Sequence, residues 1–330
     1  MRAGEELEVR ALESYLGEGA VRVQQFGGGH SNLTYLVETA RAEYVLRRAP
    51  LGPVAPKAHD MAREFGVLRA LHEVFPAAPR PYRLCEDAAV IGATFYLMER
   101  RRGRVFRDPA EIASEGAAMS AAMVDTLVAL HAVDIEATGL IALGKPDGFL
   151  ERQVKGWSER WQRARTEPET LSDEVMRWLA ERIPPAQRAT IVHNDYKLDN
   201  VMFREQEPVV EAVLDWEMTT VGDPLADLGL SLCYWKLGGA HSGDSEARRA
   251  PEGWYTREEF VGRYGERTGR DLSHLGWHEV LGVFKLAVIL QQIYYRYVQG
   301  QTRDERFAGF GERVRMLMAE ATRVMEEAKA

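Results

Sequence analysis

A polar loop between two short apolar runs most constrains how this chain folds. Residues 191–203 read IVHNDYKLDNVMF, so Ile191-Val192 and Val201-Met202-Phe203 enclose a polar centre. Short apolar runs rich in β-branched residues are typical of buried strands. A further apolar run, Val213-Leu214, leads directly into Asp215. The pattern predicts strands whose ends carry polar side chains.

Three polar residues of this region form a set suited to phosphoryl transfer. Asp195 precedes Asn200 by five residues, and Asp215 follows Asn200 by fifteen. One carboxylate orients an attacking hydroxyl and accepts its proton. An amide and a second carboxylate offer the hard oxygen ligands that hold Mg²⁺ against phosphates. A plain turn between strands, where Asn and Asp are favoured, is the structural alternative. The combination with Asp215 favours the chemical interpretation.

The order of predicted elements separates a β-rich part from a helical part. Strands are predicted over 21–26, 33–38, 43–48 and 94–99, with one helix beginning after Asp60. Helices are predicted over 110–131, 150–165 and 173–182, and again after Pro224. We therefore expect an α+β chain with a small N-lobe over 1–100, a hinge at 101–104 and a larger helical C-lobe over 105–330, with a cleft between the lobes.

Three consecutive glycines separate the first two predicted strands. Gly27, Gly28 and Gly29 lack a Cβ, so backbone N–H groups there are able to approach phosphate oxygens closely. The stretch matches neither G-x-G-x-x-G nor a Walker A motif, and a hairpin turn is the alternative. Its place at the start of the β-rich lobe favours a nucleotide loop, with Ser31 and Asn32 adding polar contacts.

The polar loops resemble those of a known enzyme family. His193, Asp195, Asn200 and Asp215, followed by Trp216-Glu217, are similar to the catalytic and metal loops of the aminoglycoside phosphotransferase-like family, which is related to choline kinases and remotely to protein kinases. The resemblance covers nearly the whole chain and implies a protein-kinase-like two-lobed fold that binds ATP and Mg²⁺. It implies Asp195 as the catalytic base, Asn200 and Asp215 as Mg²⁺ ligands, and His193 as a brace for the loop.

The same resemblance implies nucleotide contacts in the small lobe. Kinase-like folds place a basic residue on the third strand and pair it with a helix glutamate. Strand alternation favours Arg47 over Arg48 for this place, with Glu64 as its partner. Arginine instead of the usual lysine keeps the charge but presents a planar fork. A surface ion pair, which contributes little energy, is the alternative interpretation.

Two more segments receive roles from the resemblance. The strand over 94–99 is similar to the one that leads into the hinge, so we expect Met98 to line the nucleotide site and backbone groups around Glu99 and Arg101 to contact the adenine. A packed core methionine is equally consistent with the sequence. Asp227 is expected to anchor the backbone of the catalytic loop. Nothing in the sequence distinguishes ATP from GTP.

The acceptor is expected to be a hydroxyl group of a small molecule. The stretches FGGGHSNLTY (26–35), YVLRR (44–48) and VHNDYKLDN (192–200) resemble most closely the branch that also forms the N-terminal part of acyl-CoA dehydrogenase fusion proteins. This resemblance implies a hydroxyacyl-CoA or a related metabolite. An aminoglycoside, or another amino alcohol or sugar, is the alternative, although the C-terminal helices show no concentrated acidic patch for a polycation.

Two other functional classes stay open at this point. A nucleotide-binding pseudokinase serving as an interaction module would share the fold, but the intact Asp195, Asn200 and Asp215 argue against it. A hydrolase using His193, Asp195 and Asp215 as metal ligands would leave the glycines unexplained. A net charge of −8 without a basic tract argues against nucleic acid. Two cysteines and the absence of an apolar leader or spanning stretch predict a cytoplasmic protein that binds no membrane. The oligomeric state is left open.

Overall fold

The computed structural model forms two compact units. It describes residues 4–27, 32–50, 59–107, 111, 114–167, 170–236, 253–302 and 304–328. Unit 1 comprises Met1–Val105 and Val201–Thr219, and unit 2 comprises Phe106–Asn200 and Thr220–Ala330. Within the described ranges, every helix is too short or too polar to cross a lipid bilayer.

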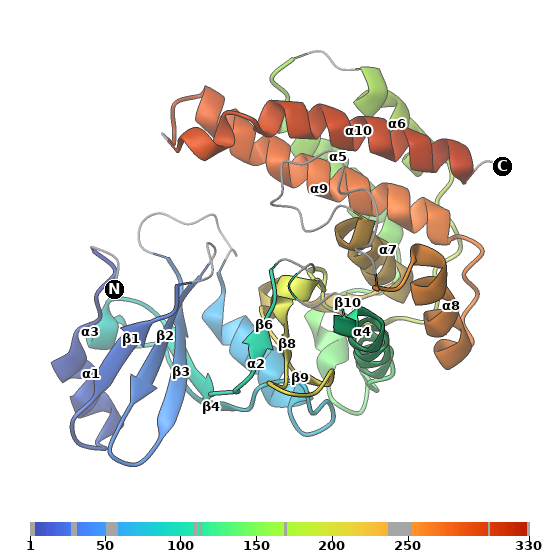
Figure 1. The fold of residues 1–330 in the computed structure, drawn as a ribbon. Helices are drawn as coiled ribbons and strands as arrows, with labels where there is room; N and C mark the ends of the chain where they lie inside the picture. Colours follow the sequence, from blue (N-terminus) through green and yellow to red (C-terminus); the bar gives the residue numbers. More distant parts are fainter. Residues whose placement is uncertain are drawn as a thin grey trace. The chain divides into compact units, whose positions relative to one another are not determined.

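An antiparallel sheet of five strands forms the centre of unit 1 (Figure 1). Its order is β1 (Arg22–Gln25), β2 (Leu33–Glu38), β3 (Glu43–Arg48), β5 (Phe95–Glu99) and β4 (Pro81–Cys85). The predictions for β2 and β3 are confirmed to the residue. No strand was predicted at β4, because this segment follows prolines at 76 and 79 and itself begins with Pro81. Pro81 is tolerated because it is the first residue of an edge strand.

Side-chain alternation along β3 sends its residues to two different layers. Leu46 and Arg48 face α1 (Val9–Leu16) and α3 (Ala88–Ile91), where an Arg48 Nη donates to the Ile91 carbonyl over 2.8 Å. Arg47 points to the opposite face and meets α2 (Met61–Leu71). The apolar core on the α1 side includes Leu12, Leu16, Tyr35, Val37, Leu46, Phe95 and Leu97. Alternation therefore places one arginine in each layer.

Helix α2 begins where the sequence predicts. The Asp60 side chain accepts the Arg63 backbone N–H over 2.9 Å, which satisfies one of the free donors of the first turn. Val67, Leu68 and Leu71 are buried, and the Phe65 ring meets the Tyr96 ring edge-on at 6.1 Å. These contacts fix α2 against the sheet.

A late segment of the chain completes unit 1. Strands β6 (Arg104–Val105), β8 (Val201–Phe203) and β9 (Val210–Val213) form a second antiparallel sheet in this order. The Val213 backbone N–H donates to the Ala77 carbonyl over 2.8 Å, and the Trp216 ring of η4 (Trp216–Met218) meets Phe75 at 6.0 Å. The residues around 215 are thus packed against the first hundred residues of the chain.

Unit 2 is mainly helical and is organised around α9 (Leu275–Val298), as Figure 1 shows. Residues 275–291 of α9 are buried almost all round, as expected of a helix at the centre of a bundle. Helices α5 (Phe149–Ala164), α6 (Thr170–Glu181), α7 (Pro224–Lys236) and α10 (Phe310–Glu327) pack against α9. Helices α4 (Gly116–His131) and α8 (Arg257–Thr268) pack against each other. Strands β7 (Thr190–Val192) and β10 (Thr220–Gly222) pair antiparallel. The prediction of an α+β chain with an N-terminal sheet and a mainly helical second part is confirmed.

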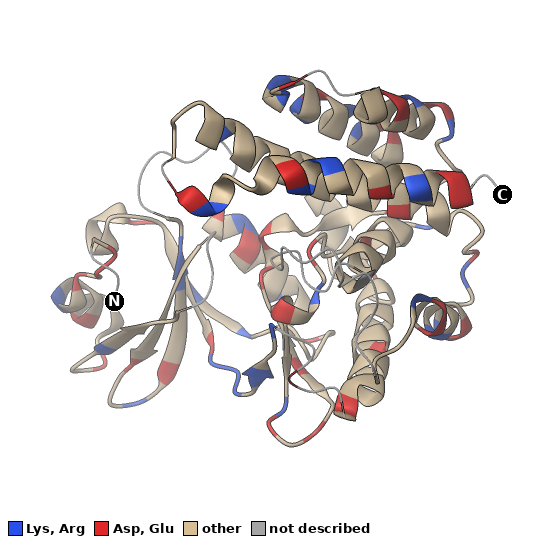
Figure 2. Cartoon of the chain, turned by 45° about the horizontal axis from the view of Figure 1, so that its top comes forward, with Lys and Arg blue, Asp and Glu red and all other residues tan. Residues whose placement is uncertain are grey.

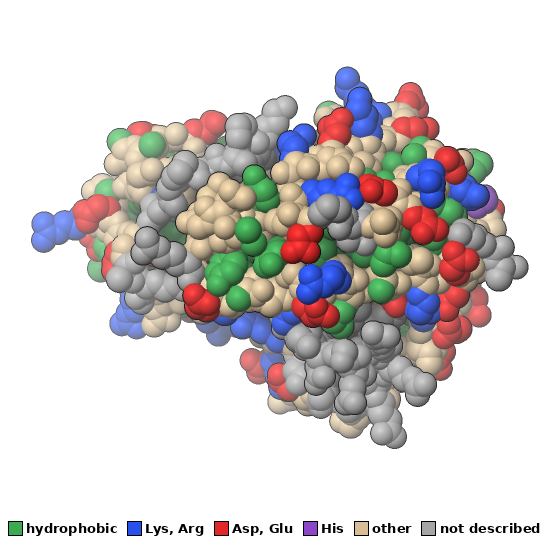
Figure 3. All heavy atoms as spheres, turned by 90° about the horizontal axis from the view of Figure 1, so that it is seen from above, with side chains coloured by type: hydrophobic (Ala, Val, Ile, Leu, Met, Phe, Trp, Pro, Cys, Tyr) green, Lys and Arg blue, Asp and Glu red, His purple; other side chains and the backbone are tan. Residues whose placement is uncertain are grey.

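Charges of both signs mix on the outer helix of unit 2. Glutamates and arginines alternate along α10 (Figure 2), with ion pairs Glu312–Arg315 and Glu320–Arg323 at 2.6 Å each. Such exposed pairs add little stability. On the face drawn in Figure 3, basic and acidic groups likewise lie interspersed among hydrophobic ones.

Candidate active site

The loop after β7 is anchored through its backbone to α7. The buried Asp227 carboxylate accepts the N–H of His193 over 2.6 Å and the N–H of Asn194 over 2.7 Å. Burial alone would raise the pKa of Asp227, but hydrogen bonding and the charge of His131 outweigh it and lower that pKa. The expectation that Asp227 anchors this loop is confirmed.

Replacing Asp227 by asparagine is expected to lower the free energy of unfolding by about 2 to 3 kcal/mol, because the amide no longer accepts both N–H groups as an anion. Since the native pKa of Asp227 is lowered, its carboxylate stabilises the fold above the ordinary value of about 3.9, and this contribution is lost as the pH falls below it. Urea denaturation at several pH values measures the difference. Asp173→Asn, on an exposed side chain, should stay within about 0.5 kcal/mol of wild type.

The Asp195 carboxylate is held by three donors. Its Oδ1 accepts the Tyr234 hydroxyl over 2.9 Å, and its Oδ2 accepts the Asn200 amide over 2.7 Å. The Lys197 Nζ lies 3.1 Å from the same Oδ2, and 21% of the Asp195 side chain stays exposed. Burial and the neighbouring Asp195 charge raise the pKa of Tyr234 well above its usual range, so the phenol stays a donor. The carboxylate is therefore both oriented and accessible.

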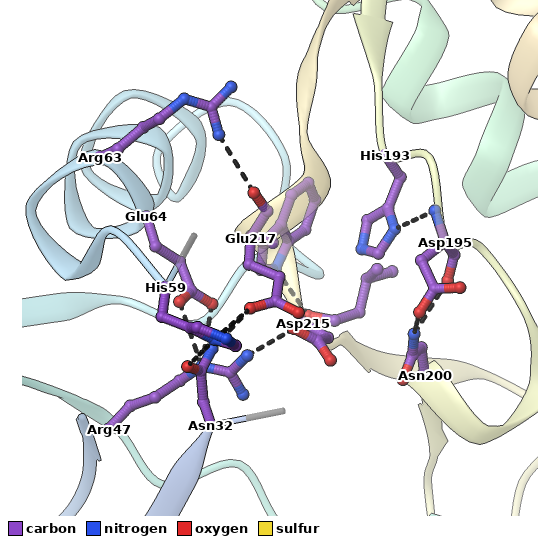
Figure 4. A network of polar contacts seen from close by, with 12 residues as sticks. Asn32, Arg47, His59, Arg63, Glu64, His193, Asp195, Asn200, Asp215 and Glu217 are labelled. Atoms are coloured by element: carbon purple, nitrogen blue, oxygen red, sulfur yellow. Dashed lines mark hydrogen bonds and ion pairs between the residues drawn. The ribbon is translucent and has the colours of Figure 1, made fainter. Parts of the chain in front are cut away.

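His193 and Asn200 complete the loop (Figure 4). The Nδ1 of the buried His193 accepts the Asp195 backbone N–H over 3.3 Å. The Asn200 amide nitrogen donates to the Asp195 carbonyl over 2.9 Å as well as to its carboxylate. Among the described residues, the Asn200 Oδ1 has no hydrogen-bond partner. Asn200 thus presents a hard oxygen donor of the kind that Mg²⁺ prefers.

A second polar group lies in unit 1, around Arg47 (Figure 4). The Arg47 Nε lies 3.1 Å from the Glu64 carboxylate, and an Arg47 Nη is paired with Asp215 Oδ1. Burial alone would lower the pKa of Arg47, but the charges of Glu64 and Asp215 outweigh it and raise that pKa, so the guanidinium stays charged. The predicted partnership between strand β3 and helix α2 is present as a buried ion pair.

Asp215 stands in a strained backbone position that its surroundings support. Its φ of 65° is left-handed, which is uncommon for a residue other than glycine and is typical of functional loops. Arg63 of α2 donates to the carbonyls of Glu217 and Thr219 and so holds the following turn. Helix α2 therefore fixes the loop that carries Asp215.

The residue after the glycine stretch is tied to the same loop. The Asn32 amide donates to the Glu217 carboxylate over 2.8 Å, and the Asn32 Oδ1 lies 2.8 Å from the His59 Nδ1. The His59 Nδ1 also lies 3.4 Å from Glu217. The contact of Asn32 with a nucleotide stays a prediction, and its contacts with Glu217 and His59 were not predicted.

The remaining predicted nucleotide residues differ in what the structure describes. Gly28, Gly29 and Ser31 lie outside the described residues, and a Cβ added to Gly27 would meet no described atom within 4 Å. Met98 is buried in β5. The Arg101 guanidinium is paired with Glu99 at 2.9 Å and with Glu211 at 3.1 Å. A contact of this segment with adenine stays a prediction.

The metal ligands expected from the sequence are chemically suitable. Asn200 and Asp215 both carry hard oxygen donors, which fits Mg²⁺ better than a soft metal. Over the described ranges, no three side chains of the types His, Cys, Asp and Glu gather as a metal site.

Comparisons with known proteins agree with the sequence resemblance. The model of the phosphotransferase enzyme family matches residues 22–272. Acyl-CoA dehydrogenase family member 11 of Rattus norvegicus is 36% identical over 316 residues, which is 90% of this chain and 41% of the rat protein. The chain thus spans about two-fifths of that relative's length. The resemblance to the kinase-like part of acyl-CoA dehydrogenase fusion proteins is confirmed.

Solved structures share the fold over almost the full chain. A Ralstonia eutropha protein assigned provisionally as an aminoglycoside phosphotransferase is 32% identical, with a TM-score of 0.84 over 98% of this chain and 99% of its own. The aminoglycoside phosphotransferase APH(4)-Ia, solved as a ternary complex with AMP-PNP and hygromycin B, is 16% identical, with a TM-score of 0.64 over 94% of this chain and 97% of its own. The predicted fold class is therefore confirmed.

Proposed function

We infer that this chain, which belongs to the phosphotransferase enzyme family, transfers the γ-phosphate of ATP to a hydroxyl group of a small molecule. The observation that carries this proposal is the Asp195 carboxylate, which three donors orient while about a fifth of the side chain stays exposed. A nucleotide-binding module without activity would have no need of a carboxylate held in this way.

The proposal assigns the proton transfer to Asp195. The acceptor hydroxyl gives its proton to the Asp195 carboxylate as its oxygen forms the new bond to the γ-phosphorus, and ADP leaves with the electrons of the broken P–O bond. Tyr234 and Asn200 hold both carboxylate oxygens and so limit the rotation of the base. Orientation of this kind lowers the entropic part of the barrier.

Nucleotide binding is assigned to residues of unit 1. Arg47, fixed by Glu64, supplies a permanent cation for the phosphates, and Gly27, Gly28, Gly29 and Ser31 supply the phosphate loop. Asn200 and Asp215 would hold Mg²⁺, which offsets charge on the transferred group when bound. The AMP-PNP bound to the related APH(4)-Ia supports an adenine nucleotide as the donor.

For the acceptor we favour a hydroxyacyl-CoA or a related metabolite. The support is the 36% identity to a protein named as an acyl-CoA dehydrogenase family member. An aminoglycoside, as in the solved relative with hygromycin B, is the alternative. The mixed charges along α10 fit a polycationic acceptor less well.

An acceptor screen with γ-labelled ATP tests the function. We expect Mg²⁺-dependent label transfer to hydroxyacyl-CoAs, at least about tenfold above that to aminoglycosides, sugars or amino alcohols, because each tenfold step needs only about 1.4 kcal/mol of differential binding. The same acyl-CoAs without the hydroxyl are the matched controls and should stay unlabelled. Label transfer to hygromycin B but to no acyl-CoA would favour the alternative acceptor. Absence of transfer to every compound would favour the pseudokinase module.

A further inference from the structure

A lysine in the middle of α9 is buried and lies in no direct ion pair within the part of the chain that the structure describes. Lys285 is 4% exposed and forms no ion pair with any described residue. Its Nζ donates to the Asn194 Oδ1 over 3.0 Å and lies 5.6 Å from the centre of the Trp157 ring. Burial of an unpaired ammonium opposes folding, and an apolar residue of equal length would suit this place in the bundle better. The fold therefore keeps Lys285 for a reason other than stability.

The surroundings of Lys285 show that it carries its charge near neutral pH. Burial lowers the pKa of Lys285 to about 8, while the carboxylates of Asp227 on α7 and Asp195 on the loop oppose this shift, and Arg160 of α5 adds to it. The neighbouring Cys233 of α7 also raises the pKa of Lys285. At pH 7 the amine is thus mostly an ammonium, which makes a stronger hydrogen bond than a neutral donor.

The partner of Lys285 precedes the proposed base directly in the chain. Asn194 has a left-handed φ of 64°, a conformation that asparagine adopts more readily than most residues other than glycine. Its backbone N–H is held by Asp227 over 2.7 Å, and its side chain is held by Lys285. Fixing both ends of Asn194 sets the direction in which the chain enters Asp195.

We propose that Lys285 is a positioning residue that acts through Asn194 to orient Asp195 for phosphoryl transfer. The proposal rests on the function inferred above. It connects the central helix of the bundle with one hydrogen bond to the residue that directly precedes Asp195. The alternative is a lysine that contacts the substrate directly. Only if Lys285 acts through Asn194 does the effect of Lys285→Met depend on the Asn194 side chain.

A double-variant cycle separates these two roles. ADP release from MgATP with a mixture of hydroxyacyl-CoAs is measured for wild type, Lys285→Met, Asn194→Gly and the double variant. We expect Lys285→Met to lower kcat about 10- to 100-fold, with the KM for ATP changed less than about threefold. Glycine adopts the left-handed conformation unaided, so in the Asn194→Gly background Lys285→Met should cost less than about threefold. Equal losses in both backgrounds, an unchanged kcat, or a loss confined to KM would overturn the proposal.

A second readout does not need activity. The backbone amide resonances of Asn194 and Asp195 should move in Lys285→Met and stay in place in Lys155→Met, a matched change at an exposed lysine of α5. We also expect Lys285→Met to melt no lower than wild type, because it removes a buried unpaired charge. Wild type without turnover would contradict the proposed function alone. Unmoved amide resonances in Lys285→Met would overturn the positioning role whether or not wild type turns over.

Discussion

Replacement of Asp195 by asparagine is expected to lower kcat about a thousandfold while the KM for ATP changes less than about threefold. Asparagine keeps the size of the side chain and one oxygen for the Tyr234 hydroxyl, but it accepts no proton at neutral pH. The residues assigned to the nucleotide phosphates lie in unit 1 and are unchanged. Single-turnover measurements with saturating MgATP would report the chemical step directly.

Asp199→Asn is the matched control for this prediction. Asp199 lies on the same loop, within 3.9 Å of Lys197, and its side chain is 32% exposed. Asp199 forms no hydrogen bond with Asp195, so we expect the kcat of the Asp199→Asn variant to stay within about threefold of wild type. An Asp195→Asn enzyme that kept more than a tenth of the wild-type kcat would remove Asp195 from the role of general base.

Local patterns in the sequence were enough to predict several parts of the site. Alternation along 43–48 assigned Arg47 and Arg48 to opposite faces of a sheet, whereas the pairing of Arg47 with Glu64 was implied by the family resemblance. The cap at Asp60 set the start of α2 and thereby placed Glu64 in the first turn of that helix. Strand alternation and helix caps can be predicted from the sequence because residues close together in the chain determine them.

Contacts between distant elements were not predictable in the same way. Tyr234 meets Asp195 across 39 positions, and Lys285 meets Asn194 across 91, with no motif to mark either residue. Lys285 stands within the apolar stretch 281–290. In the sequence it interrupts an apolar helix, and only the fold shows that it is buried beside the loop. Such residues depend on how helices pack, which composition and spacing leave open.

Replacement of Arg47 by methionine is expected to lower the free energy of unfolding by about 3 to 5 kcal/mol at pH 7. The guanidinium stands between the carboxylates of Glu64 and Asp215, and its removal leaves Glu64 buried without a cation. Burial already raises the pKa of Glu64 although Arg47 opposes this, so the loss of Arg47 raises it further. A carboxyl group whose pKa is raised in the folded state stabilises the fold at pH values below its ordinary pKa of about 4.3. This contribution is lost as the pH rises. The variant should therefore recover stability as the pH is lowered from 7 towards 5.

Arg48→Met separates this effect from the loss of any buried arginine. The Arg48 guanidinium donates to the neutral carbonyl of Ile91 and pairs with no described carboxylate, so its removal should cost less than about 2 kcal/mol and show no recovery at lower pH. Urea denaturation of both variants at pH 7 and pH 5 compares them, and Arg47→Lys serves where Arg47→Met does not fold. Equal losses in the free energy of unfolding for the two arginines at both pH values would mean that the Arg47–Glu64 ion pair makes no specific contribution to the stability of unit 1. A pH-dependent loss for Arg47 alone would instead show that Arg47 neutralises the buried Glu64 between β3 and α2, where the proposed nucleotide binding needs a fixed cation.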